Sequence, residues 1–333
     1  MKNIFLFLYI IPFALHAQSP APVVTAFPSL RIPASSRGLA MGDGGIASSE
    51  ANQQLCYNTA KTAFTQNFHQ ASVSYMPWLT GISNDTRFMN VNYLANISNS
   101  SAMGVAVTYL SLGSLSVRDD NGATLSNYHA NEYNLMGSYA LQFADKVSLG
   151  LAFHLLGQNA YTDVPKNLYS ICGDISYYQY TQLGDASKKL EWGIVVSNLG
   201  PKVNIAGAST ALPANVGIGV GYKSMDANSN DQYSFSIDAN RLIAEDWNAV
   251  RLSAGAEYGF AGQFFLRGGV SLENKYKGDR KFFGLGVGYK GLVADQSWAL
   301  DFHYLIPFGV VAAVSPFQNS YGFTLSLHFG NFQ

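Results

Sequence analysis

The feature that most constrains this chain is an alternation of apolar and polar residues, which continues from residue 68 almost to the C-terminus. In the last such run, Tyr321, Phe323, Leu325, Leu327 and Phe329 alternate with smaller or polar residues. Successive side chains of a β-strand point to opposite faces, so each run predicts a strand with one apolar face. We predict about fourteen strands in this way. They cover residues 68–77, 87–97, 102–112, 131–143, 147–157, 170–181, 189–198, 213–224, 232–241, 250–260, 263–273, 281–291, 296–305 and 320–330.

The connections between these strands fall into a short set and a long set. The short ones are 98–101, 144–146, 261–262 and 292–295, and the long ones are 113–130, 158–169, 199–212 and 306–319. An even number of antiparallel strands with short periplasmic turns and longer extracellular loops is typical of an outer-membrane barrel. We therefore predict an all-β fold, an antiparallel transmembrane β-barrel over residues 68–333. Both chain ends are expected on the periplasmic side.

Composition supports this fold and excludes others. Only 12% of the residues are charged, against about 25% in a typical soluble domain. The mean hydropathy of +0.05 is low for a bundle of membrane-spanning helices, and no window after the first twenty residues offers the ~20 apolar residues that such a helix needs. The 32 glycines, 20 tyrosines and 21 phenylalanines suit the turns and aromatic girdles of a barrel. A net charge of −1 argues against nucleic acid as a partner.

The first residues have the pattern of a secretory signal peptide, predicted over residues 1–17. Lys2 supplies the positive start, the stretch from Ile4 to Leu15 the apolar core, and Ala17 a small residue before the cleavage site. Export without a later spanning helix places the mature protein in a Gram-negative outer membrane.

Residues 18–67 differ from the rest because they have no sustained strand or helix period. The stretch from Ala26 to Phe64 mixes glycines and small residues with a few charges. Fourteen strands leave a lumen wide enough to hold such a segment, and irregular backbone is tolerated at membrane depth only where protein or water surrounds it. We therefore predict that residues 18–67 form an N-terminal extension and a plug in the lumen.

A plug inside a barrel must satisfy its charges against the wall, because unpaired buried charges are costly. On the wall, Glu257 and Arg267 alternate with Tyr258 and Leu266, which predicts that both charged side chains point inward. The plug charges expected to pair with wall residues of this kind are Arg31, Arg37, Asp43 and Glu50.

The two cysteines allow two interpretations. Cys56 lies in the predicted plug, and alternation places Cys172 on the inner face of a strand. A disulfide between them would tie the plug to the wall, since disulfides persist in exported proteins. The alternative is a pair of buried thiols.

No pattern predicts an enzyme, a metal site or a cofactor. The histidines have no metal-ligand spacing, and no set of serine, histidine and aspartate can be assembled from the sequence.

Several short motifs follow one another in an order that resembles a known family. They are Phe27–Ile32, Ser36–Gly38, Met41–Ala47, Tyr75–Leu79, Tyr109–Gly113, Asn131–Tyr133 and Tyr304–Pro307. In order and spacing they resemble the PorV family, FadL-like outer-membrane barrels of the type IX secretion system. A PorQ-like paralogue is the alternative within this group. The chain departs from the FadL-like pattern at Asn58, which is followed by threonine where that pattern has proline, so the turn geometry of the plug is expected to differ there.

This resemblance implies a protein that is not an enzyme. PorV-like proteins bind the SprA-type translocon, accept secreted cargo through its C-terminal domain, and escort it to an attachment-complex protein at the cell surface. They do so largely through their extracellular end, within outer-membrane lipids.

Two predicted extracellular loops are unusually apolar, and exposed apolar surface often marks an interaction site. Because barrel closure places the first and last strands side by side, both loops are expected to meet at one place on the rim. The candidate partner-binding residues are Trp78, Leu79, Ile306, Pro307, Phe308, Val310, Val311 and Phe317. The alternative is that the loop folds inward over the lumen or dips into the membrane.

A different class of function also fits a FadL-like barrel: transport of a hydrophobic small molecule. It requires an apolar pocket in the lumen and a lateral opening at a strand kink. The glycine-rich run from Gly217 to Gly221 is a candidate for such a kink.

Overall fold

The computed structural model describes residues 24–331 with gaps at 51–52, 66, 81–82, 84, 120, 123, 161–165, 185–186, 206, 246–248, 275–279, 295, 310–311 and 313–314. The predicted signal peptide, residues 1–17, lies outside the described residues, as do Val310 and Val311. No helix of the described part is long and apolar enough to cross a membrane.

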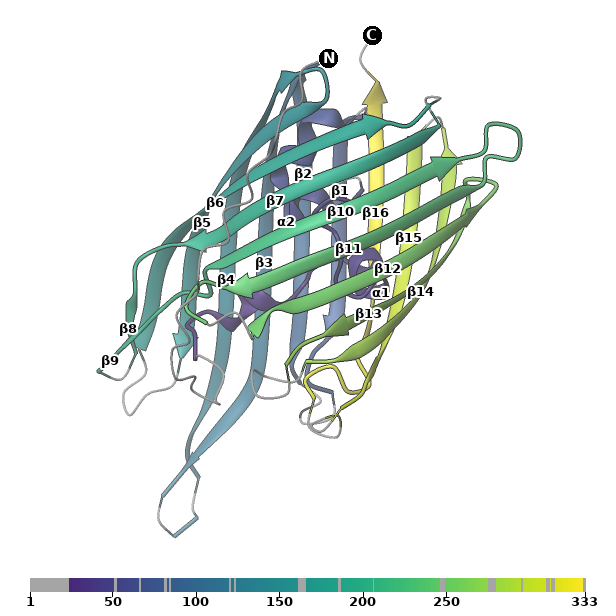
Figure 1. The fold of residues 1–333 in the computed structure, drawn as a ribbon. Helices are drawn as coiled ribbons and strands as arrows, with labels where there is room; N and C mark the ends of the chain where they lie inside the picture. The colour runs from purple at the N-terminus through teal and green to yellow at the C-terminus, as the bar shows by residue number, and fades with distance from the viewer. Residues whose placement is uncertain are drawn as a thin grey trace.

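Fourteen antiparallel strands form one closed barrel (Figure 1), which confirms the predicted fold class. Neighbours in the wall are neighbours in sequence, and the last strand pairs with the first through partners such as Val73 and Leu325. Closure pairs the strands around the whole ring, which matters in lipid, where each unsatisfied backbone group costs several kcal/mol. The strands are β1 (Asn67–Pro77), β2 (Arg87–Ser98), β3 (Ser101–Arg118), β4 (Thr124–Ala144), β5 (Val147–Ala160), β6 (Lys166–Gln182), β7 (Lys188–Leu199), β10 (Asn215–Met225), β11 (Gln232–Leu242), β12 (Arg251–Phe260), β13 (Phe264–Leu272), β14 (Phe282–Val293), β15 (Gln296–Pro307) and β16 (Tyr321–Asn331).

The alternation in the sequence becomes an alternation of exposure along each strand. On β16, Phe323 and Leu325 are exposed, whereas Thr324 and Ser326 between them are buried. The outer face is therefore apolar and the inner face polar, as a barrel in lipid requires.

Two hairpins lie where the sequence predicts loops. Residues 113–130 continue β3 and β4 as a two-stranded hairpin as far as the pair Arg118 and Thr124. The connection between β7 and β10 contains the small hairpin β8 (Val203–Ile205) and β9 (Ala208–Thr210), which is separate from the barrel sheet. The sequence does not predict these hairpins, because a hairpin that leaves the wall has no apolar outer face; the predicted loop 113–130 is therefore too long, and the predicted loop 199–212 lacks β8 and β9.

The N-terminal segment, residues 24–65, lies against the inner face of the wall. Its described residues include four short helices joined by irregular backbone, and Figure 1 shows α1 and α2 within the ring of strands. Ser35 caps α1, because its side chain accepts a hydrogen bond from Gly38 N. The helices are η1 (Pro28–Arg31), α1 (Ser36–Ala40), α2 (Gln54–Tyr57) and η3 (Thr59–Phe64).

Candidate functional site

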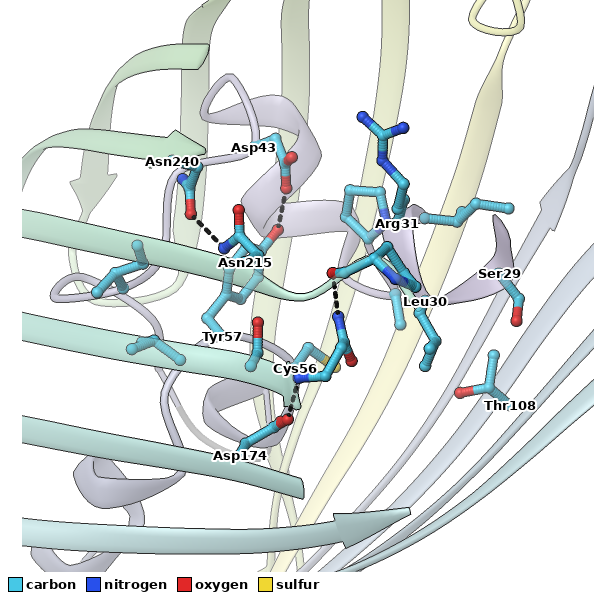
Figure 2. Close-up of a pocket in the computed structure, with 18 of the residues that line it drawn as sticks. Ser29, Leu30, Arg31, Asp43, Cys56, Tyr57, Thr108, Asp174, Asn215 and Asn240 are labelled. Carbon is cyan, nitrogen blue, oxygen red and sulfur yellow. Dashed lines mark hydrogen bonds between the residues drawn. The ribbon is translucent and has the colours of Figure 1, made fainter. Parts of the chain in front are cut away.

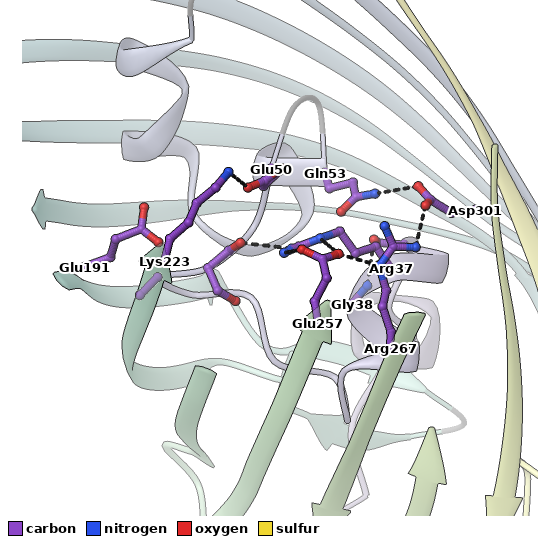
Figure 3. Close-up of polar contacts among 12 residues, drawn as sticks. Arg37, Gly38, Glu50, Gln53, Glu191, Lys223, Glu257, Arg267 and Asp301 are labelled. Atoms are coloured by element: carbon purple, nitrogen blue, oxygen red, sulfur yellow. Dashed lines mark hydrogen bonds and ion pairs between the residues drawn. The ribbon is translucent and has the colours of Figure 1, made fainter. Parts of the chain in front are cut away.

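Arg37 of α1 makes the most extensive polar contact between the N-terminal segment and the wall (Figure 3). Its Nη2 donates to Glu257 Oε1 at 2.8 Å, its Nε donates to Glu257 Oε2 at 2.9 Å, and its Nη1 donates to the Ser48 carbonyl at 2.9 Å. Arg267 also binds Glu257 and continues to Asp301. Burial alone would lower the pKa of Arg37, but the charges of Glu257 and Glu50 outweigh it and raise this pKa above its usual value. Arg37 is therefore a permanent cation held in a bidentate pair.

Two further ion pairs lie on the same side of the segment. Glu50 contacts Lys223 of β10, and Lys61 Nζ lies 3.0 Å from Glu191 Oε1 on β7. Burial would raise the pKa of Glu50, but the charges of Lys223 and Arg37 lower it well below the usual range. Burial lowers the pKa of Lys61, against the opposing charge of Glu191.

The opposite side of the segment carries a second group of charges. Asp43 pairs with Arg251 of β12 and accepts a hydrogen bond from the Tyr57 hydroxyl at 3.1 Å. Arg31 Nη2 lies 3.9 Å from Glu273, which Arg280 also binds. All four charged residues predicted to pair with the wall therefore have a partner of opposite charge. Three of these partners lie on wall strands, and the fourth, Glu273, directly follows β13.

Backbone groups of the segment are also bound by the wall. Asp238 Oδ2 on β11 accepts from Gly45 N at 2.6 Å and from Ile46 N at 3.0 Å. Asn58 Nδ2 donates to the Ile46 carbonyl at 2.8 Å and to the Tyr177 carbonyl at 3.0 Å, so its amide joins two parts of the segment to β6.

Several wall residues that hold the segment are not among those predicted from the sequence. They are Glu191, Lys223, Asp238, Arg251, Glu273 and Arg280. The signal that could have identified those within strands is a charge at an inward position of a membrane strand, the criterion that identified Glu257 and Arg267.

Wall glycines provide the space that this contact needs. A Cβ at Gly269 would lie 2.2 Å from the Met41 carbonyl carbon, and one at Gly284 would lie 2.2 Å from the Leu39 carbonyl oxygen. The backbone of α1 therefore rests directly on β13 and β14, a close approach that only glycine permits.

The glycine-rich run of β10 has the same role, and the wall is not interrupted at the candidate kink. β10 pairs in continuous register with β7 and β11 over this run. A Cβ at Gly217 or Gly219 would lie 2.7–2.8 Å from the Ile46 side chain. These glycines make room for the N-terminal segment inside a regular strand.

Two cavities adjoin the segment, one toward each end of the barrel. The cavity of about 210 Å³ lies at the end with the longer connections (Figure 2) and is lined by Arg31, Asn90, Asn134, Asn215 and Arg280 among others. The second, of about 790 Å³, lies at the end with the short turns. Its lining includes Glu50, Lys61, Gln142, Tyr180 and Lys290. Both linings mix charged and amide side chains with apolar ones, which differs from a pocket lined mainly by apolar side chains, as transport of a hydrocarbon requires.

The two cysteines are free in the structure, so the disulfide between Cys56 and Cys172 is not formed. Cys172 points inward and packs with Phe27 and Leu156, whereas Cys56 lies beside Asn92, whose Nδ2 is 3.8 Å from the sulfur. The two thiols thus have different neighbours. Burial raises the pKa of Cys56 to about 12, which makes it a poor nucleophile.

The two apolar loops meet at the rim, but part of this surface turns inward. Thr80 Oγ1 donates to the Gln318 carbonyl at 2.8 Å, which joins the loop after β1 to the loop before β16. Trp78 and Phe317 are only 7% and 5% exposed, with ring centroids 5.6 Å apart. Both pack with Leu39 in a buried cluster at the barrel mouth. The expectation that these two side chains are exposed is therefore wrong, because the mouth offers them an apolar surface to cover.

Other predicted rim residues remain at the surface. Ile306 is 42% exposed. Pro307 and Leu79 are half-buried. Phe308, also half-buried, stacks on the outward-facing Phe283 with ring centroids 4.5 Å apart.

No group of three or more histidine, cysteine, aspartate or glutamate residues that could hold a metal occurs within the described part of the chain.

A family model described as type IX secretion system protein PorV matches residues 16–246. No curated protein matches the sequence. Among solved structures, the TodX deltaS2S3 mutant monoaromatic hydrocarbon channel has a TM-score of 0.57 at 10% identity, covering 90% of this chain and 99% of that one. The Pseudomonas putida toluene transporter TodX has a TM-score of 0.53 at 11% identity, covering 93% and 98%. A Pseudomonas aeruginosa FadL homologue has a TM-score of 0.46 at 12% identity, covering 88% and 97%.

Proposed function

This chain belongs to the PorV family of type IX secretion system proteins, and from this premise we propose that it binds the SprA-type translocon, accepts cargo through its C-terminal domain, and escorts that cargo to an attachment-complex protein. The family match over more than half of the chain is the observation that carries the proposal. The protein is accordingly an outer-membrane component of that system, of a kind that is not enzymatic.

In this proposal the N-terminal segment is a fixed plug. Its charges are matched by the wall at Glu257, Lys223, Glu191 and Arg251. Breaking a buried pair such as that of Arg37 with Glu257 leaves an uncompensated charge and costs about 3–5 kcal/mol. Movement of the plug would break several such contacts together, which supports binding at the rim over passage through the lumen.

Both chain ends lie on the periplasmic side in this proposal. The turn at 145–146 belongs to the short set, at the end where β1 begins and β16 ends. Short turns face the periplasm in outer-membrane barrels, so the joined loops around Thr80 and Gln318 face outward from the cell.

We assign translocon docking to the part of this outer rim that remains at the surface, Leu79, Ile306, Pro307 and Phe308. The wider set of candidates includes Val310 and Val311, which follow Phe308 closely in the sequence and lie outside the described residues. Trp78 and Phe317 support this surface from below without contributing exposed area.

The test is co-purification of the tagged translocon with Phe308→Asp. Leu183→Asp, an exposed apolar residue in a turn at the opposite end, is the matched control. We expect the first variant to reduce the amount of translocon recovered and the control to leave it unchanged. Full recovery with Phe308→Asp, from a barrel that still migrates as folded before heating, would contradict docking at this rim.

The second candidate function is transport of a hydrophobic small molecule, and one observation favours it. An apolar groove of about 690 Å³ lies on the outer wall between Leu155, Ile171 and the start of the β8–β9 hairpin. Beside it, the pairing of β6 with β7 shifts register after Gly173. On the inner side, however, Phe27 packs against Leu156 and Val203 of the same wall region, so apolar side chains of the protein already fill this place.

Native mass spectrometry distinguishes the two functions: an apolar ligand retained in the lumen supports transport, and translocon or cargo bound to a ligand-free barrel supports escort.

A further inference from the structure

The β3–β4 hairpin continues beyond the barrel as a two-stranded arm, residues 114–130. β3 pairs with β2 only as far as the partners Ser111 and Arg87, and β4 pairs with β5 only as far as Asn131 and Asn159. Beyond these points the two strands pair only with each other among the described residues. Figure 1 shows the arm projecting farther than the other connections at that end. Each strand of the arm therefore has one backbone edge that no described strand covers.

The contacts at the base of the arm show which backbone groups point outward. Ser114 N donates to Asp85 Oδ2 at 2.8 Å, so the backbone of Ser114 faces away from β4. The partner of Ser114 across the hairpin is His129. Two residues further along each strand, Asn127 of β4 lies opposite Ser116 of β3. Antiparallel strands alternate between pairs that exchange backbone hydrogen bonds and pairs that do not, so His129 and Asn127 also direct their backbone groups outward.

Side-chain contacts agree with this orientation. Ser114 Oγ and His129 Nδ1 lie 3.1 Å apart, and Ser116 Oγ donates to Asn127 Oδ1 at 2.8 Å. Facing side chains are closer in pairs that do not exchange backbone hydrogen bonds. The two strands are thus joined at these positions by side chains, while the backbone groups remain turned to the outer edges.

The edge of β4 offers more room than the edge of β3. On β3, Asp85 already occupies the first outward donor, and the strand ends at Arg118. On β4, the side away from β3 pairs with no described strand from Thr124 to Ala130, and at its base Asn131 Nδ2 lies 3.4 Å from the His129 carbonyl.

The sequence of this β4 edge also has none of the residues that usually protect an edge. Proteins cover exposed edges, or place lysine, proline or inward charges on them, to prevent pairing with other chains. The sequence from Thr124 to Ala130 contains no proline, lysine, arginine or acidic residue. An unprotected edge that stands outside the barrel is suited to pair with another strand.

We propose that the β4 edge, centred on Asn127, receives an extended strand from the C-terminal domain of secreted cargo by β-strand addition. This inference rests on the proposed function and specifies the binding mode of its cargo step. Main-chain hydrogen bonds supply the affinity in this mode. The exposed Asn127 and Ser116 carry no charge that would select one cargo sequence, so the edge fits a signal shared by cargo proteins that otherwise differ.

The test compares proline at two positions of the arm. Asn127→Pro removes the outward N–H of β4 without removing a hydrogen bond between the two strands, whereas Ser116→Pro makes the same change on the β3 edge. Asn127→Ala removes the side chain and its contact with Ser116 but keeps the N–H. Binding of a purified type IX cargo C-terminal domain to the detergent-solubilised protein is measured for each, and heat-modifiable migration in SDS gels verifies the barrel.

We expect Asn127→Pro to weaken binding about tenfold, the equivalent of one hydrogen bond left unmade. Ser116→Pro and Asn127→Ala are expected to bind like the original protein. Equal binding by Asn127→Pro, or an equal loss in Ser116→Pro, overturns the β4 edge and leaves the proposed function standing. Absence of cargo binding by the unmodified protein overturns both the edge and the cargo step of the proposed function.

Discussion

The N-terminal segment and the β3–β4 arm are opposite in how their polar groups are satisfied. In the segment, the charges of Arg37 and Glu50 and the backbone N–H groups of Gly45 and Ile46 all have partners on the wall. The arm has a backbone edge that no described strand covers. One region is therefore complete within the chain, and the other offers hydrogen-bonding groups to a second molecule.

Because of this difference, mutations in the two regions are expected to affect different properties, stability in one and partner binding in the other. Buried polar groups require partners because their desolvation is otherwise uncompensated, so changes to the segment are expected to affect folding. Exposed backbone groups of the arm are satisfied by water until a partner replaces it, so changes there are expected to affect association.

The largest loss of stability is expected from Arg37→Met. It leaves Glu257 with one fewer cation and removes a bidentate pair, which costs about 3 kcal/mol or more. Denaturant unfolding in detergent measures the change. Lys223→Met serves as the matched control, because the side chains of its pair with Glu50 are 31% and 38% exposed and such pairs contribute about 1 kcal/mol or less. Equal losses in the two variants would contradict the buried network.

A smaller loss is expected where the wall meets the segment backbone. Gly269→Val places side-chain atoms against Met41, and such overpacking typically costs about 1–3 kcal/mol. Gly268→Val is the control, since a Cβ at Gly268 meets no atom within 4 Å. The readouts are the unfolding midpoint and protease cleavage within residues 36–64. If Gly268→Val were as damaging as Gly269→Val, the contact with Met41 would not be the cause.

A pH-dependent contribution is expected from Glu50. Its pKa in the folded protein is lowered by Lys223 and Arg37, despite burial, so its stabilising effect is complete above the ordinary pKa of about 4.5 and is lost as the pH falls through the lowered value. The pair is partly exposed, so the change is about 1 kcal/mol or less. Unfolding of Glu50→Gln measured against pH should show a smaller loss below pH 4.5 than the original protein; parallel curves would exclude this contribution.

The smallest effect on stability is expected in the arm. The double variant Ser116→Ala with Asn127→Ala removes one exposed side-chain hydrogen bond, so the free energy of unfolding should change by about 0.5 kcal/mol or less. A loss as large as that of Gly269→Val would mean that the arm stabilises the barrel.

The barrel strands were predictable because lipid imposes a simple alternation. Phe323 and Leu325 had to face outward, and Thr324 between them inward. The same criterion predicts that Glu257 and Arg267 point inward, but it does not predict which part of the N-terminal segment lies at their depth in the barrel. Pairs such as Lys61 with Glu191 could therefore not be derived from sequence, because they depend on the depth at which each part of the segment lies.

Loops gave the least reliable predictions, for a related reason. Trp78 and Phe317 are apolar in segments without alternation, so nothing in the sequence distinguishes a ring that packs inward from one that stays exposed. The arm was predicted as a loop because a water-exposed hairpin such as that around Ser116 and Asn127 needs no apolar face. The glycine run of β10 was predicted as a candidate kink, because the sequence does not show that Ile46 lies against it.

Hydrogen exchange of the protein in detergent, alone and with a cargo C-terminal domain, tests the central contrast most directly. We expect residues 36–49 and 54–64 to be protected in both states, and the arm around Asn127 to exchange quickly alone and slowly with cargo. Fast exchange throughout the N-terminal segment, or cargo-induced protection inside the barrel with none on the arm, would contradict the division into a fixed interior and an open outer edge.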